Sequence, residues 1–274
     1  MSRKLRLIAG KGDLPVQIAN EERNSGRDVY VLRLVGFVEE ALSEFDGEVV
    51  GIGEIGRQIK LLKSAQCEDV VFAGIVKRPD FSKLKLDLRG ARLLPKVLAA
   101  ARRGDDALLR TLVGVLEKEG FRVVGAEDIN GQLLAPEGVI CGDAPQGEVL
   151  SDLKRGAEVA AIIGQQDIGQ GCVVRSGLVI AVEAQEGTDE MLNRVASLPR
   201  GGGGGVLVKR PKPVQERRID LPTIGVSTVE AASYSGLVAI GLEAGGALIL
   251  DLEACKLKAE ELGIAIYGFP NDWG

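Results

Sequence analysis

The chain has 274 residues, of which 45% are hydrophobic and 27% are charged, a balance typical of a folded globular protein rather than a disordered one. Its formal net charge of −5 argues against general binding to nucleic acid. The absence of histidine excludes a Ser-His-Asp triad, a Cys-His dyad and a histidine-ligated metal, so any catalysis must use carboxylates, lysine, arginine and a bound ion.

Strand-like and helix-like segments alternate along the first half of the chain. Short apolar runs have the length of buried strands, and the segments between them have helical spacing of apolar residues. The expected strands are residues 5–9, 29–34, 49–53, 70–74 and 121–125, and the expected helices are residues 14–25, 56–64 and two between 95 and 119. This alternation predicts a parallel sheet covered by helices, as in a Rossmann-like domain.

Between Asn130 and Gly147 this periodicity fades, and glycine and proline become frequent. Such a stretch is typical of the connection between two domains. We therefore predict a Rossmann-like N-terminal domain at residues 1–133, a linker at 134–147 and an α/β catalytic domain at 148–274.

The second half again combines helices and strands. The apolar runs 171–175 and 178–182 flank the turn pair Ser176-Gly177 and predict a hairpin, so this domain is expected to contain a mixed sheet. A run of five glycines at 201–205 predicts a flexible connection. The other expected helices are residues 148–163, 228–235 and 252–262, and the other expected strands are residues 237–240, 247–250 and 264–267.

The cysteines and the apolar runs indicate the compartment. Cys67, Cys141, Cys172 and Cys255 form no C-x-x-C pair, which predicts small buried side chains in a reducing environment. The opening apolar run is too short for a signal peptide, and no run approaches membrane-spanning length. We expect a cytoplasmic protein that can still meet a membrane surface.

An acidic turn follows the second hairpin strand. Glu183, Glu186 and Asp189 lie close together in sequence, and a helix is expected to begin at Thr188 or Asp189. Free N–H groups at a helix start favour an anion, and the carboxylates beside them could hold a hard cation. Ordinary helix capping is the alternative, which accounts for Asp189 but leaves Glu183 and Glu186 unexplained.

The segment 205–225 concentrates cations around Asp220 in a backbone stiffened by prolines. The lysines and arginines of this segment would neutralise phosphate charge, while Asp220 would hold a metal ion or a water molecule against the anion. This composition suits a diphosphate site. A solvated basic strand and turn is the alternative interpretation.

A glycine-containing turn follows the first expected strand. Gly10, Gly12 and Asp13 stand where a Rossmann-like domain binds a nucleotide, although Pro15 replaces the third glycine of the dinucleotide fingerprint. The turn offers backbone N–H groups to a phosphate or a sugar hydroxyl. A tight strand-to-helix turn without a ligand is the alternative.

Two further turns of the first half carry charged residues. Lys77 and Arg78 follow a strand, at the usual position of ligand contacts in a parallel sheet, and a surface turn is the alternative. Asp105 and Asp106 either hold Mg²⁺ or cap the helix that follows them, and their spacing favours the cap.

Four segments together carry a family resemblance. They are Leu7–Pro15, Gly104–Leu109, Val182–Leu192 and Lys209–Gly225. In sequence, order and spacing they resemble the LpxI-type UDP-2,3-diacylglucosamine pyrophosphatases, and the resemblance runs along essentially the whole chain. It implies Mg²⁺-dependent hydrolysis of the pyrophosphate of UDP-2,3-diacylglucosamine to UMP and lipid X, 2,3-diacylglucosamine 1-phosphate, a step in lipid A synthesis.

The resemblance also implies roles for particular residues. Asp220 matches the essential acid of the Asp-Leu-Pro-Thr-Ile-Gly motif. The expected contacts with phosphate or sugar are Lys209, Lys212, Gln215, Arg218 and Thr188, with Gly10, Gly12, Asp13, Lys77 and Arg78 as further candidates. The expected metal ligands are drawn from Asp220, Glu183, Glu186, Asp189, Asp105 and Asp106. A homodimer and peripheral contact with the inner membrane surface are further expectations.

Two other functions are compatible with these patterns. A non-catalytic protein that binds a nucleotide sugar or lipid would keep the same cations, and it would not release UMP from the substrate. A nicotinamide oxidoreductase is suggested only by the first turn, and it would have to bind NAD.

Overall fold

The computed structural model describes residues 4–65, 69–199, 204–213 and 215–273. They form two compact units. Unit 1 comprises Met1–Gly131 with Glu216–Ile219, and unit 2 comprises Gln132–Gln215 with Asp220–Gly274. The chain therefore leaves unit 2 after Gln215 and returns to it at Asp220.

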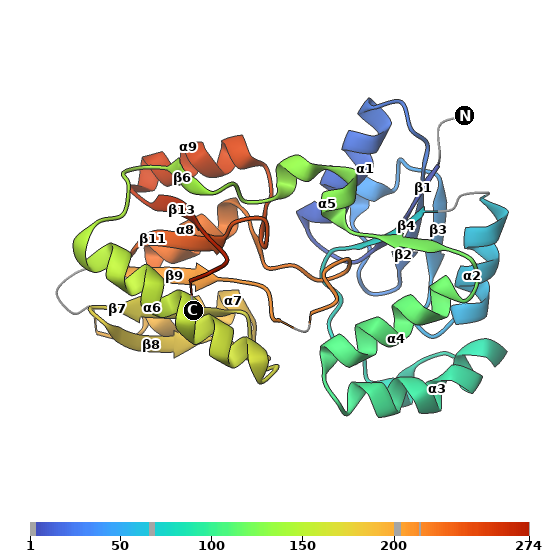
Figure 1. Ribbon diagram of the computed structural model, residues 1–274. Helices are drawn as coiled ribbons and strands as arrows, with labels where there is room; N and C mark the ends of the chain where they lie inside the picture. Colours follow the sequence, from blue (N-terminus) through green and yellow to red (C-terminus); the bar gives the residue numbers. More distant parts are fainter. Residues whose placement is uncertain (1–3, 66–68, 200–203, 214, 274) are drawn as a thin grey trace. The chain divides into compact units, whose positions relative to one another are not determined.

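Unit 1 is built on a parallel five-stranded sheet with the strand order β3-β2-β1-β4-β5 (Figure 1). The central strand β1 is buried along its whole length, and its Leu7 pairs with Val31 of β2 and Val71 of β4. Near-continuous apolar strands of this kind are expected where helices cover both faces of a sheet. The strands are β1 (Leu5–Ala9), β2 (Val29–Leu34), β3 (Gly47–Val50), β4 (Asp69–Ala73) and β5 (Arg122–Val124).

The helices of unit 1 pack on this sheet through their apolar residues. Ile59 and Leu62 of α2 and Val113 and Leu116 of α4 belong to one buried cluster with Leu32 of β2. The α-helices are α1 (Asp13–Asn24), α2 (Ile55–Ser64), α3 (Leu88–Ala101), α4 (Asp105–Glu117) and α5 (Ala126–Ile129). The 3₁₀ turns are η1 (Glu40–Leu42), η2 (Phe81–Lys83) and η3 (Gly131–Leu133).

Unit 2 contains a mixed six-stranded sheet with the strand order β6-β13-β11-β9-β7-β8 (Figure 1). The three middle strands β13, β11 and β9 are parallel, whereas β6, β7 and β8 pair antiparallel. The strands are β6 (Gly138–Cys141), β7 (Gly171–Arg175), β8 (Leu178–Val182), β9 (Gly205–Lys209), β11 (Leu237–Glu243) and β13 (Ala265–Phe269). A separate parallel pair joins β10 (Thr223–Ile224) to β12 (Leu248–Ile249).

Buried clusters lie on both faces of the unit 2 sheet. Leu153 and Ala157 of α6 pack against Val208 of β9 on one face, while Met191 of α7 and Val229 of α8 belong to the cluster of the other face. The helices are α6 (Gly147–Gln165), α7 (Thr188–Ala196), α8 (Val226–Tyr234) and α9 (Leu252–Leu262). Over the described residues, no helix combines the length and apolar character needed to cross a bilayer.

The predicted fold class, a Rossmann-like parallel sheet followed by a mixed-sheet α/β region, is confirmed. The chain differs from the predicted domain limits in two places. Residues 138–141, which were expected in a linker, form β6 and pair with β13. The sequence did not reveal this strand because it is short and lies among glycines. Residues 216–219 belong to unit 1, although they lie far inside the predicted C-terminal domain. Of the glycine run, Gly205 begins β9, and residues 201–203 lie outside the described residues.

Candidate active site

Glu183 is a buried carboxylate at the end of β8, only 6% exposed. Its N–H donates to Gly171 O at 2.8 Å, which fixes its backbone against β7. Burial raises the pKa of the Glu183 carboxyl; the charge of Lys209 opposes this shift, and that of Asp220 adds to it. Glu183 Oε2 is buried with no hydrogen-bond partner among the described residues. Such an oxygen is costly to bury, so it marks a place where a ligand would be stabilising.

Two glycines make room for Glu183, one beside its carboxylate and the other beside its backbone carbonyl. A Cβ atom at Gly171 would lie 2.6 Å from Glu183 Oε2, and one at Gly169 would lie 1.9 Å from Glu183 O. Both separations are below van der Waals contact. The position of Glu183 against β7 therefore depends on glycine at both sites.

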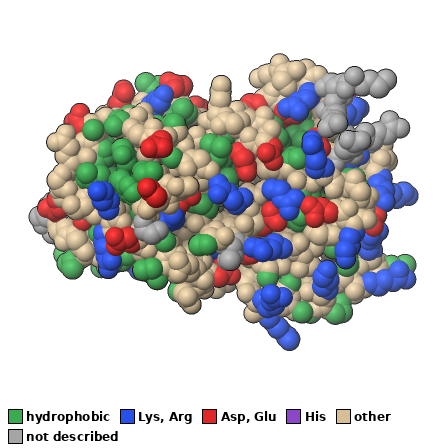
Figure 2. All heavy atoms as spheres, viewed as in Figure 1, with side chains coloured by type: hydrophobic (Ala, Val, Ile, Leu, Met, Phe, Trp, Pro, Cys, Tyr) green, Lys and Arg blue, Asp and Glu red, His purple; other side chains and the backbone are tan. Residues whose placement is uncertain are grey.

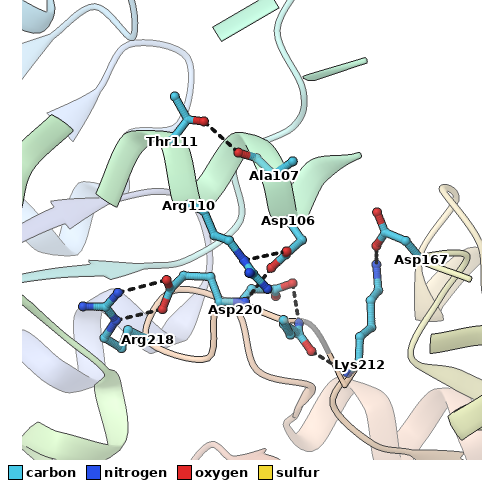
Figure 3. A network of polar contacts seen from close by, with 10 residues as sticks. Asp106, Ala107, Arg110, Thr111, Asp167, Lys212, Arg218 and Asp220 are labelled. Carbon is cyan, nitrogen blue, oxygen red and sulfur yellow. Dashed lines mark hydrogen bonds and ion pairs between the residues drawn. The ribbon is translucent and has the colours of Figure 1, made fainter. Parts of the chain in front are cut away.

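Two lysines of unit 2 lie near Glu183. Lys209 ends β9, is 3% exposed, and donates from Nζ to Thr223 O at 3.0 Å. Among the described residues this is its one hydrogen bond from Nζ, so two of the three ammonium donors can serve a ligand. Lys212 Nζ pairs with Asp167 Oδ1 at 2.7 Å (Figure 3). The charges of both lysines lower the pKa of Glu183, so they act at close range.

Asp220 is held by a buried amide. Gln215 Nε2 donates to Asp220 Oδ2 at 2.6 Å and to Gln170 Oε1 at 3.1 Å. Gln215 Oε1 in turn accepts from Lys212 N at 2.8 Å. Because Gln215 is 9% exposed and fully engaged by these bonds, it fixes the direction of the Asp220 carboxylate. Unit 2 thus gathers two carboxylates and two lysines in one cluster.

Gln215 and Asp220 flank a four-residue segment, Glu216–Ile219, which belongs to unit 1. Its first N–H, from Glu216, donates to Asp106 Oδ1 at 2.6 Å. Asp106 also pairs with Arg110 at 2.8 Å, as Figure 3 shows. Asp106 therefore fixes the start of this segment within unit 1.

Arg218 ties the same segment to α4. Its guanidinium donates to both carboxylate oxygens of Glu216, at 2.8 and 2.9 Å, and to Glu117 Oε1 at 2.7 Å. These two carboxylates raise the pKa of Arg218 above its ordinary value. The structure places Arg218 in a carboxylate network of unit 1, and its predicted contact with phosphate stays a prediction.

The other residues around the start of α7 divide between two roles. Thr188 begins the helix, and its side chain hydrogen-bonds to Glu183, which joins it to the cluster. Glu186 is exposed and pairs with Arg194 at 2.8 Å; a hydrogen bond to its own backbone and then Arg194 lower its pKa. Asp189 is exposed in the first turn of α7, a position that fits helix capping.

The first turn of unit 1 is already occupied by protein groups. Gly12 precedes α1 with φ 101°, a conformation that favours glycine, and its N–H donates to Glu39 Oε1 at 2.8 Å. A Cβ at Gly10 would lie 2.7 Å from Ile75 O, so glycine permits a close approach there. Asp13 is exposed in the first turn of α1. Because a carboxylate accepts the Gly12 N–H, an anion would have to displace Glu39, and nucleotide binding at this turn stays a prediction.

The remaining candidates also lie in unit 1. Lys77 is exposed, and Arg78 donates to Ala101 O and pairs with Asp105 at 3.4 Å. Asp105 and Asp106 both stand in the first turn of α4, where acids stabilise the helix start. The predicted metal ligands are therefore divided between the two units, with Glu183 and Asp220 in unit 2.

Sequence reasoning missed three polar groups of unit 2. Asp167 adopts φ 54° just after α6, where it meets Lys212, and Gln170 meets Gln215. Arg210, counted only as part of the basic segment, is buried and pairs with Glu243 at 2.8 Å. An aspartate between a helix and a strand is a signal for such a left-handed turn, but its partner is set by packing.

Mg²⁺ is the ion that the family resemblance implies. Within the described ranges, no group of three or more acidic or cysteine side chains lies close enough to hold a metal ion. Glu183 and Asp220 still supply two carboxylates, and Glu183 Oε2 is an unpartnered hard donor within those ranges. Because Mg²⁺ is commonly held by one or two carboxylates with water and substrate phosphates, these residues fit it.

Comparison with known proteins agrees with the four-segment resemblance. The family model of the LpxI N-terminal domain matches residues 4–133, and that of the LpxI C-terminal domain matches residues 136–267. The UDP-2,3-diacylglucosamine pyrophosphatase LpxI of Caulobacter vibrioides is 48% identical over an alignment of 272 residues, and the match covers 97% of each chain. A solved structure of CobK precorrin-6A reductase covers 98% of this chain and 88% of its own at 13% identity, and its TM-score of 0.31 is too low to support a shared fold. On the two family models and this identity, the chain belongs to the LpxI family.

Proposed function

We propose that the chain hydrolyses the pyrophosphate of UDP-2,3-diacylglucosamine to UMP and lipid X, as one step of lipid A synthesis. The observation that carries this proposal is the unit 2 cluster of Glu183 and Asp220 with Lys209 and Lys212. Its support from comparison is the 48% identity to a pyrophosphatase of that name.

The proposed reaction adds water to one phosphorus and breaks the bridging P–O bond. The oxygen of the water joins the attacked phosphorus, and the other phosphate leaves with the bridging oxygen. Lys209 and Lys212 would neutralise the phosphate charge that develops, a role suited to ammonium groups held in place by hydrogen bonds to Thr223 O and Asp167. Asp220, oriented by Gln215, would orient the water and receive its proton.

Glu183 and Asp220 are the residues that would hold Mg²⁺ in this site. When bound, such an ion supplies charge neutralisation at the phosphate oxygens. Thr188 would keep its hydrogen bond to Glu183 and so fix the direction of that carboxylate. The two lysines would then act on the phosphates from the strand β9 and the loop that follows it.

The proposed function is tested by measuring the release of UMP from purified UDP-2,3-diacylglucosamine. We expect stoichiometric UMP and lipid X, separated by chromatography and identified by mass. Binding of the intact substrate without release of UMP, over a range of Mg²⁺ concentrations, would instead identify a non-catalytic binding protein.

The assembly and location of the protein are proposed on the same family relationship. We propose a homodimer in the cytoplasm that contacts the inner membrane surface, where a diacylated sugar nucleotide is anchored by its chains. Analytical ultracentrifugation of the purified chain tests the dimer, and a monomer at micromolar concentration would rule it out.

A further inference from the structure

The outward side of α3 carries cations and no acid. Leu88, Arg92, Lys96 and Ala99 lie on successive turns of this side, Arg103 follows the helix end, and all five are exposed; we call them the α3 outer face. From Leu88 to Gly104 the sequence contains no aspartate or glutamate, in a protein whose net charge is −5. In Figure 2, Lys and Arg side chains gather over the part of unit 1 where α3 lies.

Contacts within the protein do not account for these charges. Among the described residues, Arg92, Lys96 and Arg103 form no ion pair, whereas the neighbouring Arg89 pairs with Glu119. Arg92 and Lys96 are also spaced i,i+4, so their like charges destabilise an isolated helix. The α3 outer face therefore has a cost in stability that an external anionic surface would relieve.

An apolar side chain accompanies the cations. Leu88 in the first turn of α3 is 83% exposed, and Leu86 just before the helix is 37% exposed. The opposite side of the helix, which includes Gly90 and Ala100, is buried against unit 1. One exposed leucine is unremarkable by itself, but basic residues around an exposed leucine on a helix are typical of segments that lie on a lipid interface.

We propose that the α3 outer face docks the protein on an anionic lipid surface. Arg92, Lys96 and Arg103 pair with lipid phosphates, and Leu88 enters the boundary between headgroups and chains. The reason for docking depends on the proposed function, because a diacylated substrate resides in a membrane. The docking itself rests only on charge, exposure and helical position.

The test measures binding of the full chain to vesicles of phosphatidylcholine with and without phosphatidylglycerol. We expect binding to the anionic vesicles that weakens as salt is added. The triple variant Arg92→Gln, Lys96→Gln, Arg103→Gln is expected to bind on the order of a hundredfold more weakly, since each cation near an anionic surface contributes about a fivefold factor. Leu88→Ser is expected to weaken binding several-fold without changing Tm.

A matched variant removes the same charge elsewhere. Lys4, Lys154 and Arg155 are exposed residues outside α3, and their replacement by glutamine is expected to change vesicle binding little. Equal loss in both triple variants would overturn the proposal, because net charge alone would then explain binding. Failure of the unmodified chain to bind anionic vesicles would also overturn it. So would loss of self-association in the α3 variant with unchanged vesicle binding, which would assign this face to a second copy.

Measurements of UMP release with two forms of substrate distinguish an error in the proposed function from an error in the docking surface. With substrate in detergent micelles, the α3 triple variant should release UMP at the normal rate, whereas with substrate in anionic vesicles its rate should fall along with binding. If the unmodified chain releases no UMP in either form, the proposed function fails, and the vesicle measurements still decide the docking surface.

Discussion

Asp220 is the residue on which the proposed chemistry depends most directly. Asp220→Asn keeps the shape of the side chain and an oxygen that can accept from Gln215 Nε2, but it removes the negative charge. We expect kcat to fall by about two to three orders of magnitude, with KM and Tm nearly unchanged, because an interaction made mainly in the transition state is lost. UMP release and thermal unfolding measure these quantities.

Glu190→Gln provides the control for that variant, since it neutralises an exposed acid in the first turn of α7. Its turnover should match that of the unmodified chain. Near-native turnover in Asp220→Asn combined with a lower Tm would mean that Asp220 only supports the structure, and Glu183 would then carry the proposed proton transfer.

Gly171 tests whether the position of the buried carboxylate matters. Alanine would place a Cβ 2.6 Å from Glu183 Oε2 and 3.3 Å from Val208 O, so the carboxylate must move. We expect Gly171→Ala to lose at least about tenfold in turnover and about 1–3 kcal/mol in the free energy of unfolding. Denaturant unfolding and UMP release report the two effects separately.

Gly114→Ala is the control for this substitution, and we expect it to raise stability rather than lower it. It lies inside α4, and a Cβ there would meet no atom within 4 Å. Gly114→Ala should therefore raise the free energy of unfolding by about 0.5–1 kcal/mol and leave turnover unchanged. Full activity in Gly171→Ala would contradict a role for Glu183 in the reaction.

The buried thiols should be inert in the folded protein. Burial raises the pKa of Cys172 to about 12 and that of Cys255 to about 11, and it also raises the pKa of Cys141. In a Cys67→Ser background, iodoacetamide at mildly alkaline pH should label these three thiols only after denaturation, because the thiolate is the nucleophile. Rapid labelling of Cys172 in the folded chain would contradict its burial.

At the scale of elements, the loop that contains Lys212 and Asp220 is the segment whose residues are divided between the two units. Its two ends, Gln215 and Asp220, are bonded to each other in unit 2, and its middle, Glu216–Ile219, packs with unit 1. Ile219 packs against the apolar core of unit 1, and Arg218 bonds to Glu117 of α4. Within unit 2, the hydrogen bond from Gln215 fixes the Asp220 carboxylate.

Arg218 separates this positioning role from the predicted phosphate contact. If it positions the loop, Arg218→Ala should lower kcat about tenfold with a small change in KM, and Arg218→Lys should restore part of it through one remaining bond to Glu216 or Glu117. If it binds phosphate, KM should rise instead while kcat changes little. Steady-state kinetics on all three proteins distinguishes the two.

At the scale of the whole molecule, the metal requirement is the main open test. EDTA should abolish UMP release, and Mg²⁺ or Mn²⁺ should restore it, because these hard ions suit the carboxylates Glu183 and Asp220. Far-UV circular dichroism should not change on chelation, since both units have their own buried cores. Full activity after exhaustive chelation would leave charge neutralisation to Lys209 and Lys212 alone.

The sequence by itself determined the fold class and most of the elements, but not β6 or α5. The alternation of apolar runs with helical segments predicts the parallel sheet of unit 1, and the Ser176-Gly177 turn predicts the β7–β8 hairpin and hence the mixed sheet of unit 2. These features depend on local periodicity and turn chemistry, which a single sequence carries. The four segments that carry the family resemblance likewise predicted the family, which the family models confirm.

Only the tertiary structure decided which charged residues share a site. Glu183 and Lys209 come together because β8 and β9 lie on either side of β7, and the pairing of β9 with β7 joins segments that no local pattern connects. Lys212 and Asp220 follow β9 in the chain and lie near enough to Glu183 for their charges to shift its pKa. The same packing carries Arg218 to unit 1 and leaves Glu186 on the surface with Arg194. The physical reason is that the type and spacing of residues along the chain indicate which chemistry a residue can perform. Its neighbours in space are determined by burial and by long-range strand pairing.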